Sequence, residues 1–185
     1  VPIGAYYGIQ TTRALENFPI TGYRLDEALI KAMGIVKKAA ALANMEAGLL
    51  DELRGQVIVA AAQEVIEGKY NEQFVVDPIQ GGAGTSINMN ANEVIANRAI
   101  EILGGKLGDY SLISPNSHVN MSQSTNDAFP TSLRIALLRR VESLLQATEE
   151  VEKELRLKSV EFDDVLKMGR THLQDAVPIR MGQEF

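Results

Sequence analysis

The sequence predicts a mainly α-helical protein with minor β structure, and three observations support that class. Apolar residues recur every three or four positions through most of the chain after residue 24. Glycines and capping residues divide this pattern into segments of helix length. Stretches with the alternating pattern typical of strands are few and short.

Residues 1–24 have mixed polarity and no helical repeat, so we expect extended segments and turns there. Glycine and proline interrupt this stretch at Pro2, Gly4, Gly8, Pro19 and Gly22. A first helix is expected from Leu25 to a stop near Gly48. Its apolar positions have helical spacing and are Leu25, Leu29, Met33, Val36, Ala40 and Ala43.

Two further helices are expected next. Asp51 can cap the start of the second helix and Gly68 can end it, because aspartate accepts from backbone N–H groups and glycine tolerates the left-handed conformation. Residues 69–87 are expected to form a loop. The third helix is expected from about Asn88 to Leu103, with Gly104 ending it.

The polar residues 106–129 precede a long helix that begins near Pro130, since proline suits the first helical turn. If this helix reaches residue 160, it spans roughly 45 Å at about 1.5 Å per residue. Ile135 and Leu157 lie off its apolar stripe, so more than one face requires burial. The helix therefore indicates a bundle whose other members lie in further sequence or in other subunits. The stripe consists of Leu133, Leu137, Leu138, Val141, Leu144, Leu145, Val151 and Leu155.

The composition excludes several kinds of site. The 185 residues include 18 Lys and Arg, 24 Asp and Glu and no Cys, for a formal net charge of −6. Without Cys, this chain has no disulfide, thiolate metal site or cysteine nucleophile. His118 and His172 are the only histidines, so a three-histidine metal site is excluded too. The acidic balance argues against nucleic acid as a partner.

The sequence contains no run of about 18 apolar residues, so we expect no membrane-spanning helix in it. The first residues also lack the basic and apolar regions of a secretory signal. We therefore expect a cytoplasmic location and no membrane partner. The chain starts at Val1 and stops at Phe185, directly after a dense polar stretch, so we expect it to be a piece of a longer protein.

A glycine-rich stretch, Gly81–Ser86 (GGAGTS), lies just before the third expected helix. Glycines let the backbone approach an anion, and a helix start adds N–H donors and partial positive charge. The lysine of a Walker A loop and the third glycine of a dinucleotide fingerprint are both missing. An anion site and a plain tight turn before a capped helix both fit this stretch.

A second polar stretch, Ser122–Asp127 (SQSTND), lies before the long helix and is followed by Phe129–Ser132 (FPTS). Small neutral donors at a helix start can bind a carboxylate without a charged side chain. Simple N-capping by Asn126 or Asp127 also fits, although a cap needs one such residue rather than a run.

The third stretch, Gly169–Asp175 (GRTHLQD), combines an expected helix-stopping glycine with a cation, a hydroxyl and an imidazole. Histidine is the side chain best suited to exchange protons near neutral pH. His172 is therefore a candidate catalytic residue, with a hydrogen-bonded structural histidine as the alternative. Asp175 is near enough in sequence to be its partner.

Together these stretches resemble the aspartase/fumarase superfamily. The resemblance covers essentially the whole chain in collinear order. Its motifs are Val1–Phe18 (VPIGAYYGIQTTRALENF), Gly81–Asn97 (GGAGTSINMNANEVIAN), Val119–Thr131 (VNMSQSTNDAFPT) and Lys167–Phe185 (KMGRTHLQDAVPIRMGQEF). Within the superfamily, the sequence is most similar to aspartate ammonia-lyases. Fumarases typically carry two serines before the asparagine, where this chain has Ser124, Thr125 and Asn126.

The resemblance implies reversible deamination of L-aspartate to fumarate and ammonia. Removing the C3 proton puts a second negative charge on the adjacent carboxylate, as an aci-carboxylate that preorganised donors would stabilise. By motif position, the residues that hold this carboxylate would be Thr85, Ser124 and Thr125. Thr171 would contact the α-carboxylate. Asn126 would bind substrate near the amino group, and His172 would be a catalytic residue on that side.

The resemblance also implies an architecture. Residues 1–126 would form a mostly helical N-terminal domain, and residues 127–185 would begin a central helical bundle that is truncated here. A homotetramer is implied, with each active site assembled from three subunits, no organic cofactor and no metal. The base in this family is thought to be a serine in a C-terminal loop that is not in this sequence. The chain alone is therefore expected to be inactive.

Two alternatives stay open. A fumarate hydratase of the same superfamily would act on a different dicarboxylate, L-malate. A non-catalytic helical assembly module would keep the fold without the reaction. The three intact polar motifs argue against the module, because a pure scaffold has no use for them.

Overall fold

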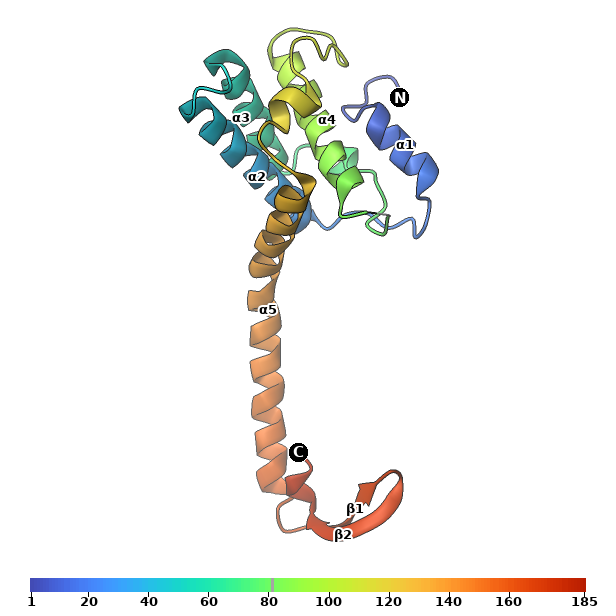
Figure 1. Cartoon of the computed structure of the whole chain (residues 1–185). Helices are drawn as coiled ribbons and strands as arrows, with labels where there is room; N and C mark the ends of the chain where they lie inside the picture. Colours follow the sequence, from blue (N-terminus) through green and yellow to red (C-terminus); the bar gives the residue numbers. More distant parts are fainter. Residues whose placement is uncertain (81) are drawn as a thin grey trace. The chain divides into compact units, whose positions relative to one another are not determined.

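A computed structural model describes residues 1–80 and 82–185. Within these residues the protein is mainly α-helical with a two-stranded sheet, which confirms the predicted class (Figure 1). The chain forms two compact units, Val1–Arg139 and Arg140–Phe185, and each is described by itself. Gly81 of the glycine-rich motif lies outside the described residues.

The first unit is built on helices packed around one apolar core. They are α1 (Ile9–Asn17), α2 (Glu27–Glu46), α3 (Glu52–Ile66) and α4 (Thr85–Ile102). Helix α2 packs against α3, and both α3 and α1 pack against α4 (Figure 1). Three consecutive residues of α4, Val94, Ile95 and Ala96, are completely buried. Helix α4 therefore runs through the core rather than along its surface.

The predicted ends of α2 and α3 are confirmed by their caps. Asp51 Oδ1 accepts a hydrogen bond from Arg54 N at 3.0 Å at the start of α3. Gly48, Gly68 and Gly104 follow α2, α3 and α4 with φ values of +70°, +83° and +79°. This left-handed conformation ends helices, and glycine adopts it without steric cost.

Helix α1 corrects the expectation that residues 1–24 are only extended segments and turns. Gly8 precedes α1 and has no side chain to cap it. The cap comes instead from the buried Glu93 of α4, whose carboxylate accepts from the N–H groups of Gly8, Gln10 and Thr11 at 2.9–3.0 Å. The Thr11 hydroxyl donates to it as well, at 2.6 Å. A partner this distant in sequence leaves no local pattern to detect.

Replacing Glu93 with glutamine is expected to loosen α1 specifically. The amide keeps the shape but turns one acceptor oxygen into a donor that faces N–H groups, at a cost of about 2 kcal/mol. Hydrogen exchange at the Gln10 and Thr11 amides should then accelerate roughly 30-fold in the full-length protein. Glu101→Gln, on the exposed end of the same helix, is the matched control. Unchanged protection in Glu93→Gln would show that α1 is held by other contacts.

Helix α4 starts at Thr85, before the predicted Asn88. Gly84 precedes it in the left-handed conformation, with φ of +81°, and offers no side-chain cap. Gln80 from the preceding loop supplies one, because its Oε1 accepts from Ser86 N at 3.1 Å. A glutamine six residues before the amide that it caps is not a usual capping pattern, so the start predicted from the sequence was too late. The same loop contains a short 3₁₀ helix, η1 (Asn71–Gln73).

Helix α5 (Thr125–Glu161) also starts before its predicted position, and Pro130 lies inside it. Ser124 Oγ accepts from Asn126 N at 3.2 Å, and Ser124 O accepts from Asp127 N and Ala128 N. The helix is therefore capped by Ser124, which corrects the alternative of capping by Asn126 or Asp127. The polar stretch before it includes a short π-helix, η2 (Pro115–Val119).

The second unit contains most of α5 and a β-hairpin of β1 (Leu166–Thr171) and β2 (Gln174–Arg180), followed by η3 (Met181–Gln183). The prediction that Gly169 stops a helix is wrong. Gly169 is a buried residue of β1, at a shift in the strand register. The helix has already ended at Glu161. Its end is fixed by the returning chain, because Gly182 N donates to Phe162 O at 3.0 Å.

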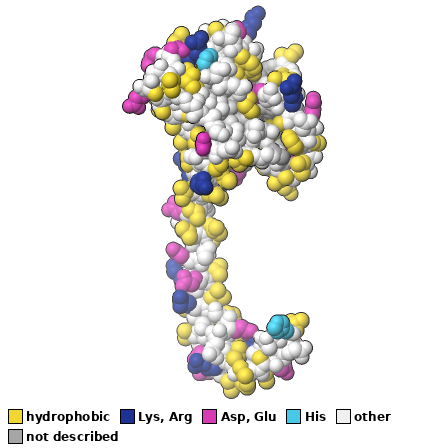
Figure 2. All heavy atoms as spheres, viewed as in Figure 1, with side chains coloured by type: hydrophobic (Ala, Val, Ile, Leu, Met, Phe, Trp, Pro, Cys, Tyr) yellow, Lys and Arg dark blue, Asp and Glu magenta, His cyan; other side chains and the backbone are white. Residues whose placement is uncertain are grey.

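Along α5, large apolar side chains are exposed, as its two-faced pattern predicts. Leu138, Leu144 and Leu157 are 72%, 64% and 62% exposed. Hydrophobic side chains follow the helix on the face that Figure 2 shows. The described helices include none with both the length and the apolar content needed to cross a membrane. An exposed apolar face of this kind is typical of a helix from a helical bundle.

Purified chain 1–185 is expected to self-associate, because exposed apolar patches of several hundred Å² or more drive association. Its net charge of −6 opposes association. Light scattering and a dye for hydrophobic surface provide the measurement. A variant with Leu138, Leu145 and Leu157 changed to glutamine should associate less. A monodisperse wild-type monomer that binds no dye would contradict the expectation.

Candidate active site

Two of the predicted polar motifs meet in the first unit, at the starts of α4 and α5. A Cβ atom added to Gly84 would lie 2.4 Å from Phe129 Cγ, so only glycine lets the two segments approach this closely. One turn into α4, Asn88 Nδ2 donates to Thr125 Oγ1 at 3.0 Å. Each motif alone fitted either an anion site or a plain helix start, and the resemblance implied that both bind one carboxylate. The structure places the two helix starts side by side.

The hydroxyl groups of this cluster keep their protons free for a ligand. Thr85, the first residue of α4, is exposed and bonds through its side chain to no described residue. Ser124 Oγ and Thr125 Oγ1 act as acceptors, from Asn126 N and Asn88 Nδ2. A hydroxyl has one donor and two acceptor positions, so each can still donate. The helix starts add partial positive charge, which suits an anion.

Asn126 is exposed on the first turn of α5, next to this cluster. It does not cap the helix, because Ser124 does. Its amide can both donate and accept. The cluster therefore offers hydroxyls and one amide, with no cationic side chain on its surface among these residues.

A buried lysine lies beneath the cluster, and the sequence analysis missed it. Lys37 of α2 is completely buried. Its Nζ donates to Asn120 Oδ1 and Gln123 Oε1, both at 2.9 Å. Burial lowers the pKa of Lys37 to about 7. The detectable signal was its position, four residues after Met33 and four before Ala41, on the apolar face of the helix.

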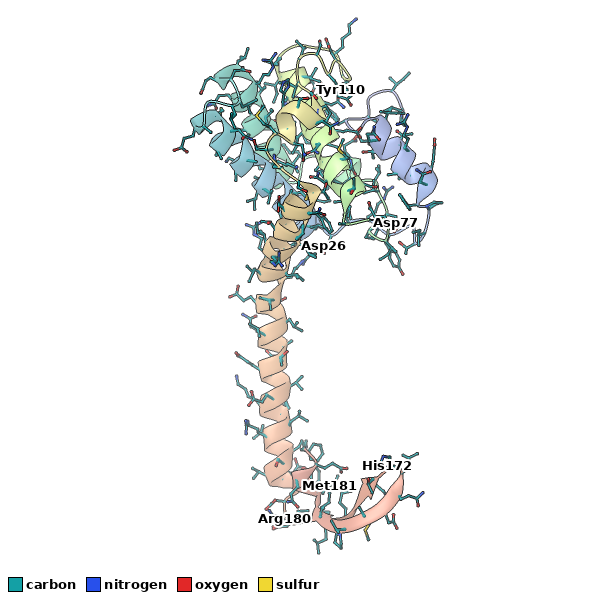
Figure 3. The ribbon with its side chains drawn as sticks, viewed as in Figure 1. Asp26, Asp77, Tyr110, His172, Arg180 and Met181 are labelled. Atoms are coloured by element: carbon teal, nitrogen blue, oxygen red, sulfur yellow. The ribbon has the colours of Figure 1, made fainter. Side chains whose placement is uncertain are left out.

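The third predicted motif forms the hairpin of the second unit (Figure 3). Thr171 pairs with Gln174, so His172 and Leu173 make a two-residue turn. Both have left-handed φ values, +46° and +62°, at positions where Asn-Gly is the usual choice. Such strain costs of order 1–3 kcal/mol and often marks functional sites. Both side chains are exposed, and Thr171 Oγ1 lies 3.3 Å from His172 Nδ1.

Other titratable candidates are engaged elsewhere. Asp175 forms an ion pair with Arg170 at 2.8 Å instead of serving His172. His118 Nδ1 accepts from Ser114 N at 2.9 Å, and burial lowers the pKa of this imidazole. His118 is thus a hydrogen-bonded structural histidine, whereas His172 is free to face a ligand.

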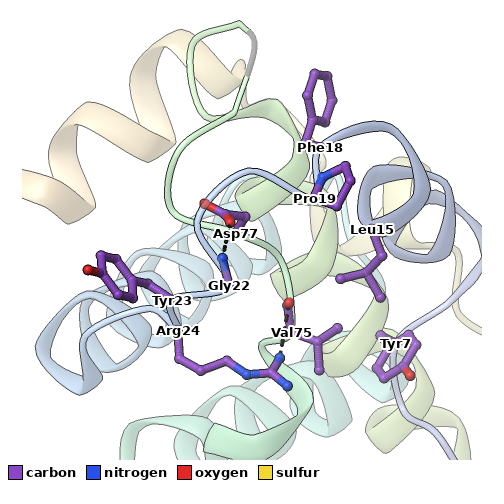
Figure 4. A pocket seen from close by; sticks show the side chains of 9 residues that line it. All are labelled: Tyr7, Leu15, Phe18, Pro19, Gly22, Tyr23, Arg24, Val75 and Asp77. Carbon is purple, nitrogen blue, oxygen red and sulfur yellow. Dashed lines mark hydrogen bonds between the residues drawn. The ribbon is translucent and has the colours of Figure 1, made fainter.

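A cavity of about 410 Å³ in the first unit contains none of the predicted site residues (Figure 4). Its polar groups are used internally, since Arg24 Nη1 donates to Val75 O at 3.0 Å. Burial alone would raise the pKa of Asp77, but hydrogen bonds from Thr21, Ile79 and Gly22 outweigh it and lower the pKa to about 2. This carboxylate therefore anchors the segment after α1.

Comparison with known proteins identifies the family of the chain. A family model described as Lyase matches residues 1–185, and the chain therefore belongs to this family, the aspartase/fumarase superfamily. Aspartate ammonia-lyase from a Bacillus species is 69% identical over 185 residues, which are 100% of this chain and 40% of that protein. Fumarate hydratase class II from Halobacterium salinarum is 54% identical over 186 residues, 100% of this chain and 39% of that protein.

Solved structures agree with the fold. The crystal structure of fumarate lyase:delta crystallin from Brucella melitensis, in native form, matches with a TM-score of 0.81 and 54% identity. The match covers 100% of this chain and 43% of that one. The chain thus spans about 40% of the length of the relatives it matches.

Proposed function

We propose that the full-length protein is an aspartate ammonia-lyase, which converts L-aspartate reversibly to fumarate and ammonia. The observation that supports this most is the meeting of two hydroxyl-bearing helix starts, with Thr85 on one and Ser124 and Thr125 on the other. Neutral donors gathered there suit a carboxylate whose charge grows during the reaction. The 69% identity to an aspartate ammonia-lyase from Bacillus supports the same reaction.

In this proposal, a base removes a proton from C3 of L-aspartate. The electron pair moves into the adjacent carboxylate, which becomes a doubly charged aci-carboxylate, and then forms the C2–C3 double bond as ammonia leaves C2. Thr85, Ser124 and Thr125 donate to that carboxylate. Because these donors are preorganised and neutral, they stabilise the developing charge without attracting the base.

The remaining roles are also proposals for the whole protein. Thr171 contacts the α-carboxylate, Asn126 binds near the amino group, and His172 exchanges a proton on that side. The base serine comes from sequence beyond these 185 residues. The strained, exposed turn that presents His172 supports a functional role for that residue.

We further propose a homotetramer in which each active site combines residues from three subunits. Residues 1–126 would be the N-terminal domain, and residues 127–185 would begin the central helical bundle. The exposed apolar face of α5 supports this assembly, since it requires partners. A cytoplasmic location is part of the same proposal.

A fumarate hydratase is the second candidate function. The 54% identity to the fumarate hydratase of Halobacterium salinarum favours it. Thr125 argues against it, because fumarases typically have a second serine at this position.

Absorbance of fumarate distinguishes these functions in the full-length protein. L-Aspartate and L-malate are offered separately under the same conditions. Fumarate formed from L-aspartate and not from L-malate is expected. Turnover of L-malate alone would replace the proposal with a hydratase, and turnover of neither would favour an assembly module.

A further inference from the structure

Lys37 is an unusual residue for the core of a helical domain. Its side chain is completely buried, and among the described residues its ammonium bonds only uncharged oxygens, Asn120 Oδ1 and Gln123 Oε1. A buried cation without a carboxylate is costly unless something else compensates it. The fold alone gives no reason to keep the charge.

The neighbours of Lys37 are amides supplied by two elements. Asn120 and Gln123 come from the segment before α5, and Asn88 and Asn92 of α4 donate to the same Asn120 Oδ1 at 3.1 and 3.2 Å. None of these described neighbours is ionisable. The lowered pKa of Lys37 accordingly has burial as its cause, with no contribution from a second charge.

A continuous chain of hydrogen bonds leads from this ammonium to the hydroxyl cluster. Lys37 Nζ bonds Asn120 Oδ1 at 2.9 Å, Asn88 Nδ2 bonds that same oxygen at 3.1 Å, and Asn88 Nδ2 also bonds Thr125 Oγ1 at 3.0 Å. Lys37 Nζ is therefore within about 9 Å of the Thr125 hydroxyl. Asn88 on this path is buried and Asn120 is half-buried, so solvent screens the path less than it would at the surface.

The same lysine also fixes the geometry of the polar loop. Gln123 Nε2 donates to Val119 O and Met121 O, and Asn120 Nδ2 donates to Gln123 O. By holding the two amide oxygens, Lys37 sets which way both amides point. The loop then delivers Ser124 directly to the start of α5.

We propose that Lys37 is a positioning residue that also supplies the positive charge behind the hydroxyl cluster, so that the substrate carboxylate bound there is its counter-ion. This inference rests on the proposed function and deepens it. The cluster residues Thr85, Ser124, Thr125 and Asn126 carry no charge, and the exposed Asp127 follows them on the first turn of α5. The positive charge that favours an anion is therefore assigned to the buried layer below. There it cannot form an ion pair with the reacting base.

The proposal predicts how strongly ligand binding and catalysis depend on the charge of Lys37. When Lys37 is protonated, its unit charge about 9–12 Å away, at an effective dielectric near 20, changes the binding of one negative charge about tenfold. The carboxylate gains a second charge as the C3 proton leaves, so the chemical step should gain about the same factor again. Removing the charge should therefore raise the inhibition constant of succinate about tenfold and lower kcat/KM about 100-fold.

Three substitutions in the full-length protein separate charge from structure. Lys37→Met removes charge and hydrogen bonds, Lys37→Gln keeps donors without charge, and Lys37→Arg keeps the charge. Lys38→Met is the matched control, because Lys38 is the next residue of α2 and bonds Gln63 Oε1 at 2.9 Å instead. Inhibition by succinate, kcat and KM, and melting with and without succinate are measured for each.

Both neutral variants are expected to assemble and to melt no lower than the wild type without ligand, since an uncompensated buried charge is removed. Both should bind succinate about tenfold more weakly, while Lys37→Arg and Lys38→Met retain affinity. Wild-type affinity for succinate in Lys37→Gln, or failure of both neutral variants to assemble, would overturn the proposal and leave Lys37 a structural residue. A wild type that neither turns over L-aspartate nor binds succinate would instead remove the proposed function.

Discussion

Purified chain 1–185 is expected to release no fumarate from L-aspartate above a mock preparation. In the proposed mechanism the proton is removed by a serine that this sequence does not contain. Catalytic groups that act as a unit lose nearly all their effect when one is missing, with losses on the order of 10⁶ in kcat. The remaining hydroxyls could still bind a dicarboxylate, but binding alone does not break the C3–H bond.

The measurement compares chain 1–185 with the full-length protein at equal subunit concentration, following fumarate absorbance over hours. The full-length protein serves as the positive control for substrate and conditions. Activity in the shorter chain that survives a second purification would contradict the expectation. It would also show that a base lies within residues 1–185, with His172 as the first residue to substitute.

Much of the fold could be predicted because its determinants are local. Asp51 caps the start of α3 and Gly68 follows its end, and both residues lie next to the helix in sequence. The start of α1 could not be predicted, since its cap is the carboxylate of Glu93, which belongs to α4. A contact that forms only in the tertiary structure leaves no periodicity or capping pattern near the helix it stabilises.

The hairpin was missed for a different reason. Gly169 looked like a helix stop because the long apolar pattern has no earlier glycine. In the structure the helix ends at Glu161, where Gly182 returns to bond Phe162 O. The turn between the strands carries His172 and Leu173, neither of which is a typical residue for left-handed backbone. Local turn chemistry therefore pointed away from the observed hairpin.

The sequence indicated the surface residues of the candidate site, but it did not indicate the buried Lys37 beneath them. Thr85 and Thr125 were identified as parts of separate motifs, and the structure joins their helices through Asn88. Lys37 was not predicted as a buried residue, because a lysine inside an apolar repeat is ordinarily solvated. Which residues surround its ammonium depends on the packing of α2 against the loop before α5, and the sequence does not encode that in any short pattern.

Thr125→Val in the full-length protein is expected to lower kcat/KM by about 10²–10³, or about 3–4 kcal/mol. Valine keeps the shape of threonine and deletes the proton that would reach the developing carboxylate charge. The loss should fall mainly on kcat/KM, because this interaction strengthens as charge builds in the transition state. Thr125→Ser keeps the hydroxyl and should retain most of the activity.

The structure also sets the expected cost in stability. Thr125 does not cap α5, since Ser124 does, so loss of a cap is not expected. Its Oγ1 accepts from Asn88 Nδ2, which in the valine variant keeps only its bond to Asn120 Oδ1. One lost hydrogen bond of this kind costs about 1 kcal/mol. Thr131→Val, an exposed position of the same helix, is the matched control and should change neither quantity.

Kinetics and melting of the three variants therefore distinguish a catalytic from a structural hydroxyl. If Thr125 acts on the substrate, Thr125→Val loses at least 100-fold in kcat/KM, far more than a 1 kcal/mol change in stability can produce in an enzyme that remains folded. If its hydroxyl serves only Asn88, melting falls slightly and kcat/KM stays near the wild-type value. In that second case, the carboxylate would have to be held by Thr85 and Ser124 without Thr125.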